Sequence, residues 1–193
     1  MTDFWLFFEL GREHIADLNG YDHILFIIAL CIRYTYKDWK KVLILVTAFT
    51  IGHSITLALS VLEQVSFSGE WIEFLIPVSI LATAIANVFE KDFRFRSRLP
   101  LIYFLAVFFG LIHGLGFSNY LKSLMSKDTN IVSQLLAFNL GLEAGQLLIV
   151  LSIMIVSVIC IRWLHFPRRE YLLFVSGAVS GIALIMALER IPF

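Results

Sequence analysis

The chain has 193 residues, of which 59% are hydrophobic and only 16% are charged, and its mean hydropathy is +0.85. Water-soluble domains carry roughly 25% charged residues, so this composition excludes an ordinary soluble globule and predicts a membrane protein. Basic and acidic residues are equal at 15 each, so the net charge gives no reason to expect a nucleic-acid partner. Cys31 and Cys160 stand alone in apolar runs and indicate no disulfide framework.

The N-terminal segment differs from the rest, because Phe4 to Leu18 mixes aromatic residues with charged ones. This mixture predicts an amphipathic helix that lies in the membrane interface, within residues 1–18. Its start carries Asp3 and no basic residue before Arg12, which is not typical of a signal peptide. We therefore expect the segment to be retained.

Long apolar runs fill the chain beyond residue 18. In hydrocarbon such runs must form helices or closed barrels, and these are too continuous for the alternating pattern of a barrel. The sequence therefore predicts an all-α polytopic membrane protein, a single transmembrane domain over 1–193 with a six-helix bundle over 19–193. The crossings are expected at residues 19–36, 42–62, 71–89, 99–121, 131–162 and 169–189.

Lys and Arg concentrate in alternate connections between these crossings. The positive-inside rule places the basic connections in the cytoplasm, so both termini are predicted to face outward. Acidic residues gather on the outer side, which would attract cations, although depletion of Lys and Arg alone would also leave such a pattern. The basic connections contain Arg33, Lys37, Lys40 and Lys41, then Lys91, Arg94, Arg96 and Arg98, then Arg162, Arg168 and Arg169.

Ionisable side chains fall inside the apolar runs, where each costs about 2.5–3.5 kcal/mol near the bilayer centre and needs a partner or a task. Helical rise places them at one level in the outer half of the membrane. Imidazole and carboxylate together suit nickel, cobalt, zinc or iron. The alternative is a buried hydrogen-bonded network that binds nothing. The predicted metal ligands are Asp22, His23, His53, His113 and Glu143.

Further polar residues accompany this set. Asn139, Glu143 and Gln146 are spaced to form one stripe, which is expected to face the bundle interior. His14 and Asp17, on the interfacial segment, are expected to lie in the solvated interface, and the alternative is that they supply further metal ligands or line an entry vestibule. The possible additional site residues are His14, Asp17, Ser54, Asn139 and Gln146.

Glycines four residues apart recur in the last three crossings. Such GxxxG pairs let helix backbones approach closely, so the fourth, fifth and sixth crossings are predicted to pack tightly against one another. The pairs are Gly110 with Gly114, Gly141 with Gly145, and Gly177 with Gly181.

Four motifs follow one another along the chain: GYDHILF, TAFTIGHSITL, GLIHGLGF and FNLGLEAGQ. With them the sequence resembles the HupE/UreJ family of small bacterial membrane proteins over nearly its whole length. The resemblance implies an inner-membrane protein of six or seven helices, described for the family as a nickel or cobalt permease that accompanies hydrogenase and urease maturation. It also implies that His14, Asp22 and His23 match the family's first metal-handling motif, and that His113 with Gly114 match its later one.

The leading hypothesis is a permease that captures a divalent transition metal (nickel, cobalt or zinc) from the outer side. Its expected partners are the lipid bilayer, the metal ion and either a second copy of the chain or a metalloenzyme-maturation partner. The alternative is a membrane-embedded metal-dependent hydrolase with a zinc-like site and Glu143 as general base, which the apolar inner halves of several crossings favour. A third hypothesis is a metal-free assembly partner.

Overall fold

The computed structural model describes residues 3–18, 20–65, 67–89, 101–124 and 131–192, and every regular element in those ranges is helical. The predicted basic connection of Lys91, Arg94, Arg96 and Arg98 lies outside these ranges. The predicted all-α fold is confirmed. The elements are α1 (Asp3–Ile15), α2 (Asp22–Cys31), η1 (Tyr36–Asp38), α3 (Trp39–Val61), α4 (Gly69–Phe89), α5 (Leu101–Leu124), α6 (Ile131–Val158), the π-helical turn η2 (Ile159–Trp163) and α7 (Arg168–Glu189).

Within the described ranges, four helical segments are long and apolar enough to cross a membrane, and the chain is a membrane protein on that basis. The prediction of six full crossings is met only in part. Because α2 has ten residues, it extends for only about 15 Å at the helical rise, half of a ~30 Å hydrocarbon core. α5 has 24 residues, and within it Ile102–Ser118 forms a further apolar helical stretch. The four candidate spans are Tyr36–Val61, Gly69–Phe89, Ile131–Trp163 and Arg168–Glu189.

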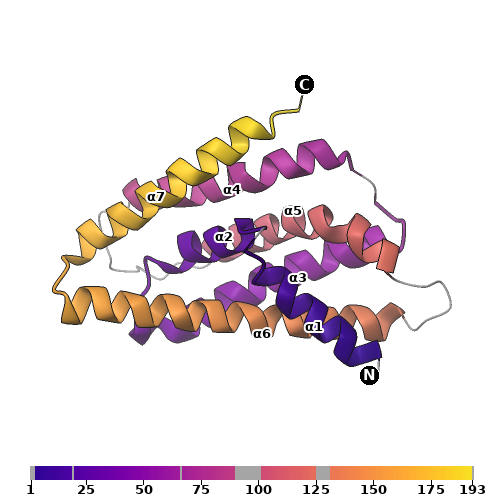
Figure 1. Cartoon of the computed structure of the whole chain (residues 1–193), viewed down its shortest axis with the longest axis horizontal. Coiled ribbons are helices and arrows are strands. Elements are labelled where there is room, and N and C mark those ends of the chain that lie inside the picture. The colour runs from indigo at the N-terminus through magenta and orange to yellow at the C-terminus, as the bar shows by residue number, and fades with distance from the viewer. Residues whose placement is uncertain (1–2, 19, 66, 90–100, 125–130, 193) are drawn as a thin grey trace.

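The helices pack mainly as three pairs, α3 with α5, α1 with α6, and α4 with α7, while α2 contacts α4, α6 and α7 (Figure 1). Glycines explain two of these pairs. A Cβ atom on Gly110 of α5 would overlap the carbonyl oxygen of Phe49 in α3, and one on Gly141 of α6 would overlap that of Phe8 in α1. Helix backbones therefore touch at both crossings.

The prediction that the last three crossings pack on one another through their glycine pairs is wrong. The glycines of α5 face α3, and those of α6 face α1. Among the described residues, no neighbouring atom lies within 4 Å of a Cβ built on Gly177 or Gly181 of α7. A GxxxG pair predicts that some backbone approaches closely, but the partner depends on which helix presents a matching surface.

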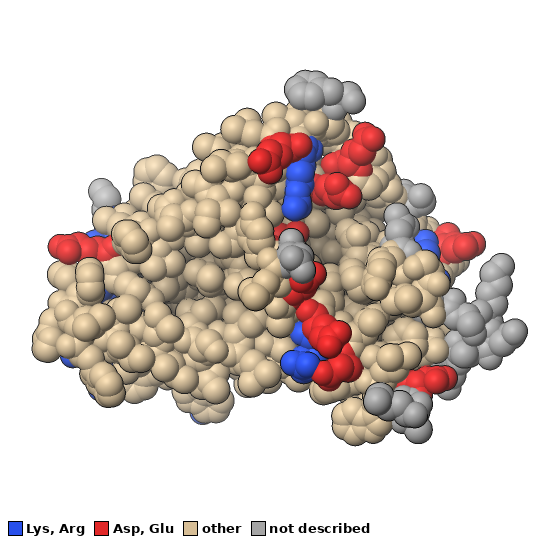
Figure 2. All heavy atoms as spheres, viewed as in Figure 1, with Lys and Arg blue, Asp and Glu red and all other residues tan. Residues whose placement is uncertain are grey.

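The surface agrees with a membrane location. Figure 2 shows a broad face with charged residues only at its left edge, and beside it a band in which Asp and Glu predominate over a few Lys and Arg, here called the acidic band. The acidic band runs over α1, the start of α2, the beginning of α4 and the end of α7. Large apolar side chains of α6 are exposed, among them Leu148 and Ile155. A contiguous apolar surface of this kind is suited to contact with lipid.

Candidate metal centre

Two histidines meet where α1 ends and α2 begins. His14 lies in the last turn of α1 and His23 in the first turn of α2, and their ring centroids are 4.6 Å apart. α1 reaches this position because Gly145 of α6 leaves room for the side chain of Ile15. The close contact of α1 with α6 therefore determines where His14 stands.

Two more histidines come from the α3 and α5 pair. Gly114 of α5 lies against the backbone of His53 in α3, so His113 next to it comes near the same level. The ring centroid of His23 is 6.1 Å from that of His53 and 5.1 Å from that of His113. Four helices thus bring four imidazoles together.

Three of these residues form a group suited to a metal ion, here called the three-histidine site: His14, His23 and His53. One ring nitrogen from each can be chosen so that all three atoms lie within 4.8 Å of one another. His53 has no exposed surface, and neither of its ring nitrogens has a hydrogen-bond partner among the described residues. The buried Nε2 atoms of His14 and His23 also lack partners there. A buried polar atom left unpaired costs about 1–3 kcal/mol, so these nitrogens fit a ligand-binding role.

Aromatic side chains surround the cluster. Phe117 packs against His14 with ring centroids 3.7 Å apart, and Phe138 stacks on His53 at 6.5 Å. His14 lies on α1, which is not among the candidate spans. Burial lowers the pKa of His14 well below its ordinary value, and the imidazoles of His23 and His53 lower it further. The neutral form, which is the form that binds metal, is therefore favoured.

Asp22 lies behind His23 and holds its ring. His23 Nδ1 is 3.0 Å from Asp22 Oδ1, and the backbone N–H of His23 donates to the same oxygen at 2.9 Å. The second carboxylate oxygen is 3.6 Å from Nη1 of Arg190. A carboxylate that accepts from one imidazole nitrogen leaves the other free to bind metal, the arrangement that orients many metal-ligating histidines. The geometry thus presents His23 Nε2 to the site.

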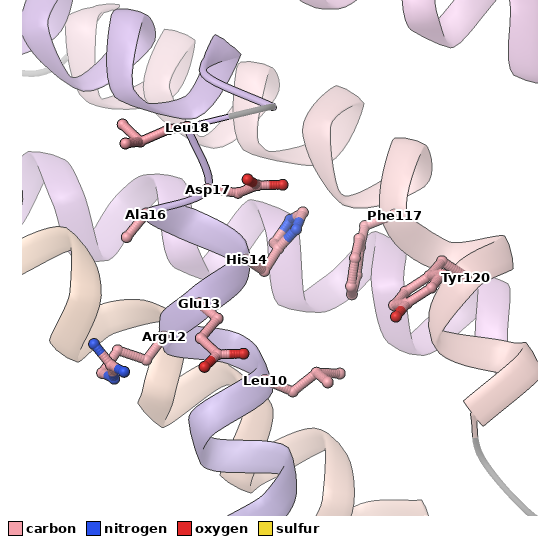
Figure 3. A pocket seen from close by; sticks show the side chains of 9 residues that line it. All are labelled: Leu10, Arg12, Glu13, His14, Ala16, Asp17, Leu18, Phe117 and Tyr120. Carbon is pink, nitrogen blue, oxygen red and sulfur yellow. The ribbon is translucent and has the colours of Figure 1, made fainter.

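A cavity of about 760 Å³ borders the site at His14. Figure 3 shows the ring of His14 directed toward Phe117, with the carboxylates of Asp17 and Glu13 nearby, and all four residues line the cavity. The cavity connects the surface near the acidic band with one of the clustered imidazoles. Its lining consists of Leu10, Arg12, Glu13, His14, Ala16, Asp17, Leu18, Phe117 and Tyr120.

Two of the remaining predicted residues, Glu143 and Gln146, lie in a second polar group, between α3 and α6. Thr47 Oγ1 donates to Glu143 at 2.8 Å, and Thr50 Oγ1 donates to the side-chain oxygen of Gln146 at 2.7 Å. The predicted inward orientation of this part of the stripe is confirmed. Glu143 is not a member of the group of ligand atoms described above. Two other candidates bond to helix carbonyls, Ser54 to Thr50 and Asn139 to Leu135.

Sequence reasoning missed two residues beside the cluster. Ser79 of α4 lies with its Oγ 3.3 Å from His113 Nε2, and Arg190 approaches Asp22 as described. The sequence carries little signal for Ser79, because a single serine in a membrane helix commonly bonds to a carbonyl oxygen of its own helix, as Ser79 does to that of Ile76. Arg190 gave no signal, because it follows the last crossing.

The fold and the cluster together define a helical membrane protein with a buried histidine-rich centre. The chain belongs to the HupE/UreJ family, since the family model described as "HupE / UreJ protein" matches residues 1–190. Among curated proteins and among solved structures, no match to the chain is found.

Proposed function

We propose that this protein is a bacterial inner-membrane permease for a divalent transition metal of the nickel or cobalt type, which the three-histidine site binds from the outer side. The observation that carries the proposal is the convergence of buried imidazoles whose nitrogens have no other partner among the described residues. Membership of the HupE/UreJ family supports an association with metal.

The donor set suits this cargo. Imidazole binds nickel, cobalt and zinc well, whereas softer metals prefer thiolate. No cysteine belongs to the group of ligand atoms found among the described residues, and Cys31 is buried in the hydrophobic core. At the metal–nitrogen distance of about 2.0–2.1 Å found for zinc, neighbouring tetrahedral ligand atoms stand about 3.4 Å apart. In the structure the three histidine nitrogens lie within 4.8 Å of one another, which is a wider spacing. Binding therefore draws the rings together by small side-chain rotations, with Asp22 holding His23.

The cavity beside His14 supplies the route inward from the surface. Glu13 and Asp17 on its wall, and the acidic band around it, concentrate cations at its mouth. His14 is common to the cavity and the three-histidine site, so it is the first imidazole that an arriving ion meets. This role differs from the solvated interface expected for His14 from the sequence.

The competing proposal, a metal-dependent hydrolase, needs a general base beside the metal. Glu143 was the sequence candidate, and its carboxylate accepts a hydrogen bond from Thr47 in the α3 and α6 group. A homo-oligomer or a metalloenzyme-maturation partner, and termini that face outward, belong to the permease proposal as further expectations.

Uptake of Ni²⁺ into proteoliposomes tests the proposal. We expect accumulation with the wild-type protein and its loss in His23→Ala and His53→Ala. The matched control is His165→Asn, which changes an exposed histidine outside the cluster and keeps a residue that tolerates its positive φ of 54°. Unchanged uptake in His53→Ala would sink the proposal, and metal binding without uptake in the wild type would favour the hydrolase.

A further inference from the structure

The fourth histidine of the cluster has a partner on a separate helix. Ser79 of α4 is buried, and its Oγ lies 3.3 Å from Nε2 of His113, which is itself buried. The same hydroxyl group donates to the carbonyl oxygen of Ile76 at 2.7 Å. The other ring nitrogen, His113 Nδ1, has no partner among the described residues.

The two contacts of the Ser79 hydroxyl group determine which ring nitrogen of His113 carries the hydrogen. A serine hydroxyl has one hydrogen, and the short bond to Ile76 uses it. The contact with His113 therefore requires Nε2 to carry the hydrogen and donate it to Ser79 Oγ. A neutral imidazole has one N–H, so Nδ1 then bears a lone pair and is able to bind a metal.

His113 lies next to the three-histidine site on the side away from the cavity. Its ring contacts Phe26 at 5.1 Å and Phe49 at 5.3 Å between centroids. Phe26 follows His23 by one turn of α2, and Phe49 precedes His53 by one turn of α3, so both mark the next level beyond those histidines. An ion that leaves His23 in this direction meets His113.

We propose that Ser79 is a positioning residue that fixes His113 in the Nε2–H tautomer, so that His113 Nδ1 receives the metal ion from the three-histidine site. The inference rests on the proposed transport function and adds a second station to it. His23 and His113 are then held in opposite tautomers, one by Asp22 through Nδ1 and the other by Ser79 through Nε2. Each presents its remaining nitrogen to the ion.

Nitrogen-15 NMR of histidine-labelled protein in nanodiscs, without metal, reads the tautomer directly. The signals of His113 are assigned by their disappearance in His113→Ala. We expect the Nε2–H form in the wild type and in Ser79→Thr, and a shift toward a mixture of both forms in Ser79→Ala. An Nδ1–H form of His113 in the wild type, or no change in Ser79→Ala, overturns the inference.

Transport and binding are then measured with Ni²⁺ on the same variants. We expect uptake by Ser79→Ala to fall on the order of tenfold, the lower end of the effect of removing the partner of a ligating imidazole, with restoration in Ser79→Thr. Equilibrium binding at the three-histidine site stays unchanged. The control is Ser152→Ala on the exposed face of α6, where the hydroxyl also bonds a helix carbonyl, that of Leu148, at 2.9 Å.

The outcomes separate the two proposals. Wild-type uptake by Ser79→Ala, with binding intact, overturns the positioning role and leaves the three-histidine site standing. Undiminished Ni²⁺ binding in His23→Ala overturns the proposed function itself, whatever the result for Ser79.

Discussion

Two polar regions inside this bundle differ in how completely their groups are paired. Between α3 and α6, the side chains of Thr47, Thr50, Glu143 and Gln146 bond to one another at 2.7–2.8 Å. In the histidine cluster, buried ring nitrogens are left without partners among the described residues. Since unpaired buried polar groups are costly, the first region is suited to holding helices together and the second to taking a ligand.

The largest effect is expected at the backbone contact between α1 and α6, which positions His14 in the cluster. Gly141→Val places a side chain against the carbonyl oxygen of Phe8 and pushes α1 away from α6. Overpacking costs typically 1–3 kcal/mol, so we expect destabilisation of about 3 kcal/mol at this backbone contact and loss of Ni²⁺ binding as His14 moves out. Thermal unfolding and calorimetric titration measure both. Gly177→Val on α7, whose Cβ position is open, is the control and should bind normally.

His53→Leu sharpens the comparison, because it should act on function and stability in opposite directions. Ni²⁺ binding should be lost with the ligand. The metal-free protein should gain roughly 1 kcal/mol of unfolding free energy, because two unpaired buried nitrogens are removed and a side chain of similar size fills the space. A lower melting temperature in detergent without metal would show that His53 is a structural residue.

Asp22→Asn tests the support behind His23. The amide keeps an oxygen near His23 Nδ1 but loses the negative charge, so Ni²⁺ affinity should fall about 10- to 100-fold, as is common for such partners. Arg190→Gln should have a smaller effect, because its contact with Asp22 is longer, at 3.6 Å. Equal affinity of Asp22→Asn and wild type would argue that Asp22 does not orient the ligand.

The smallest effect is expected in the paired region. Thr50→Val removes the hydroxyl that donates to Gln146 and should cost about 1 kcal/mol of unfolding free energy. Ni²⁺ affinity should stay at the wild-type value, because the ligand nitrogens are untouched. A marked loss of affinity would mean that the two regions act as one site.

The sequence predicted the helical membrane character and singled out His23, His53 and His113, which lie close together in the structure, because ionisable residues in apolar runs are costly and conspicuous. For His14 it favoured solvated interface over ligation, since position on an amphipathic segment does not reveal that Gly11 and Gly141 let α1 pack against α6. It also could not separate Glu143 from the histidines. Helical rise gives the depth of a residue, but the direction of its side chain depends on which helix lies opposite.

X-ray absorption spectroscopy of the Ni²⁺-loaded protein tests the central claim most directly. We expect one bound Ni²⁺ ion per chain, with scattering from imidazole ligands. In His14→Ala, His23→Ala and His53→Ala, measured at a Ni²⁺ concentration high enough to keep the ion bound, we expect one imidazole ligand fewer. Coordination by oxygen alone, or an identical spectrum in all three variants, would contradict the claim.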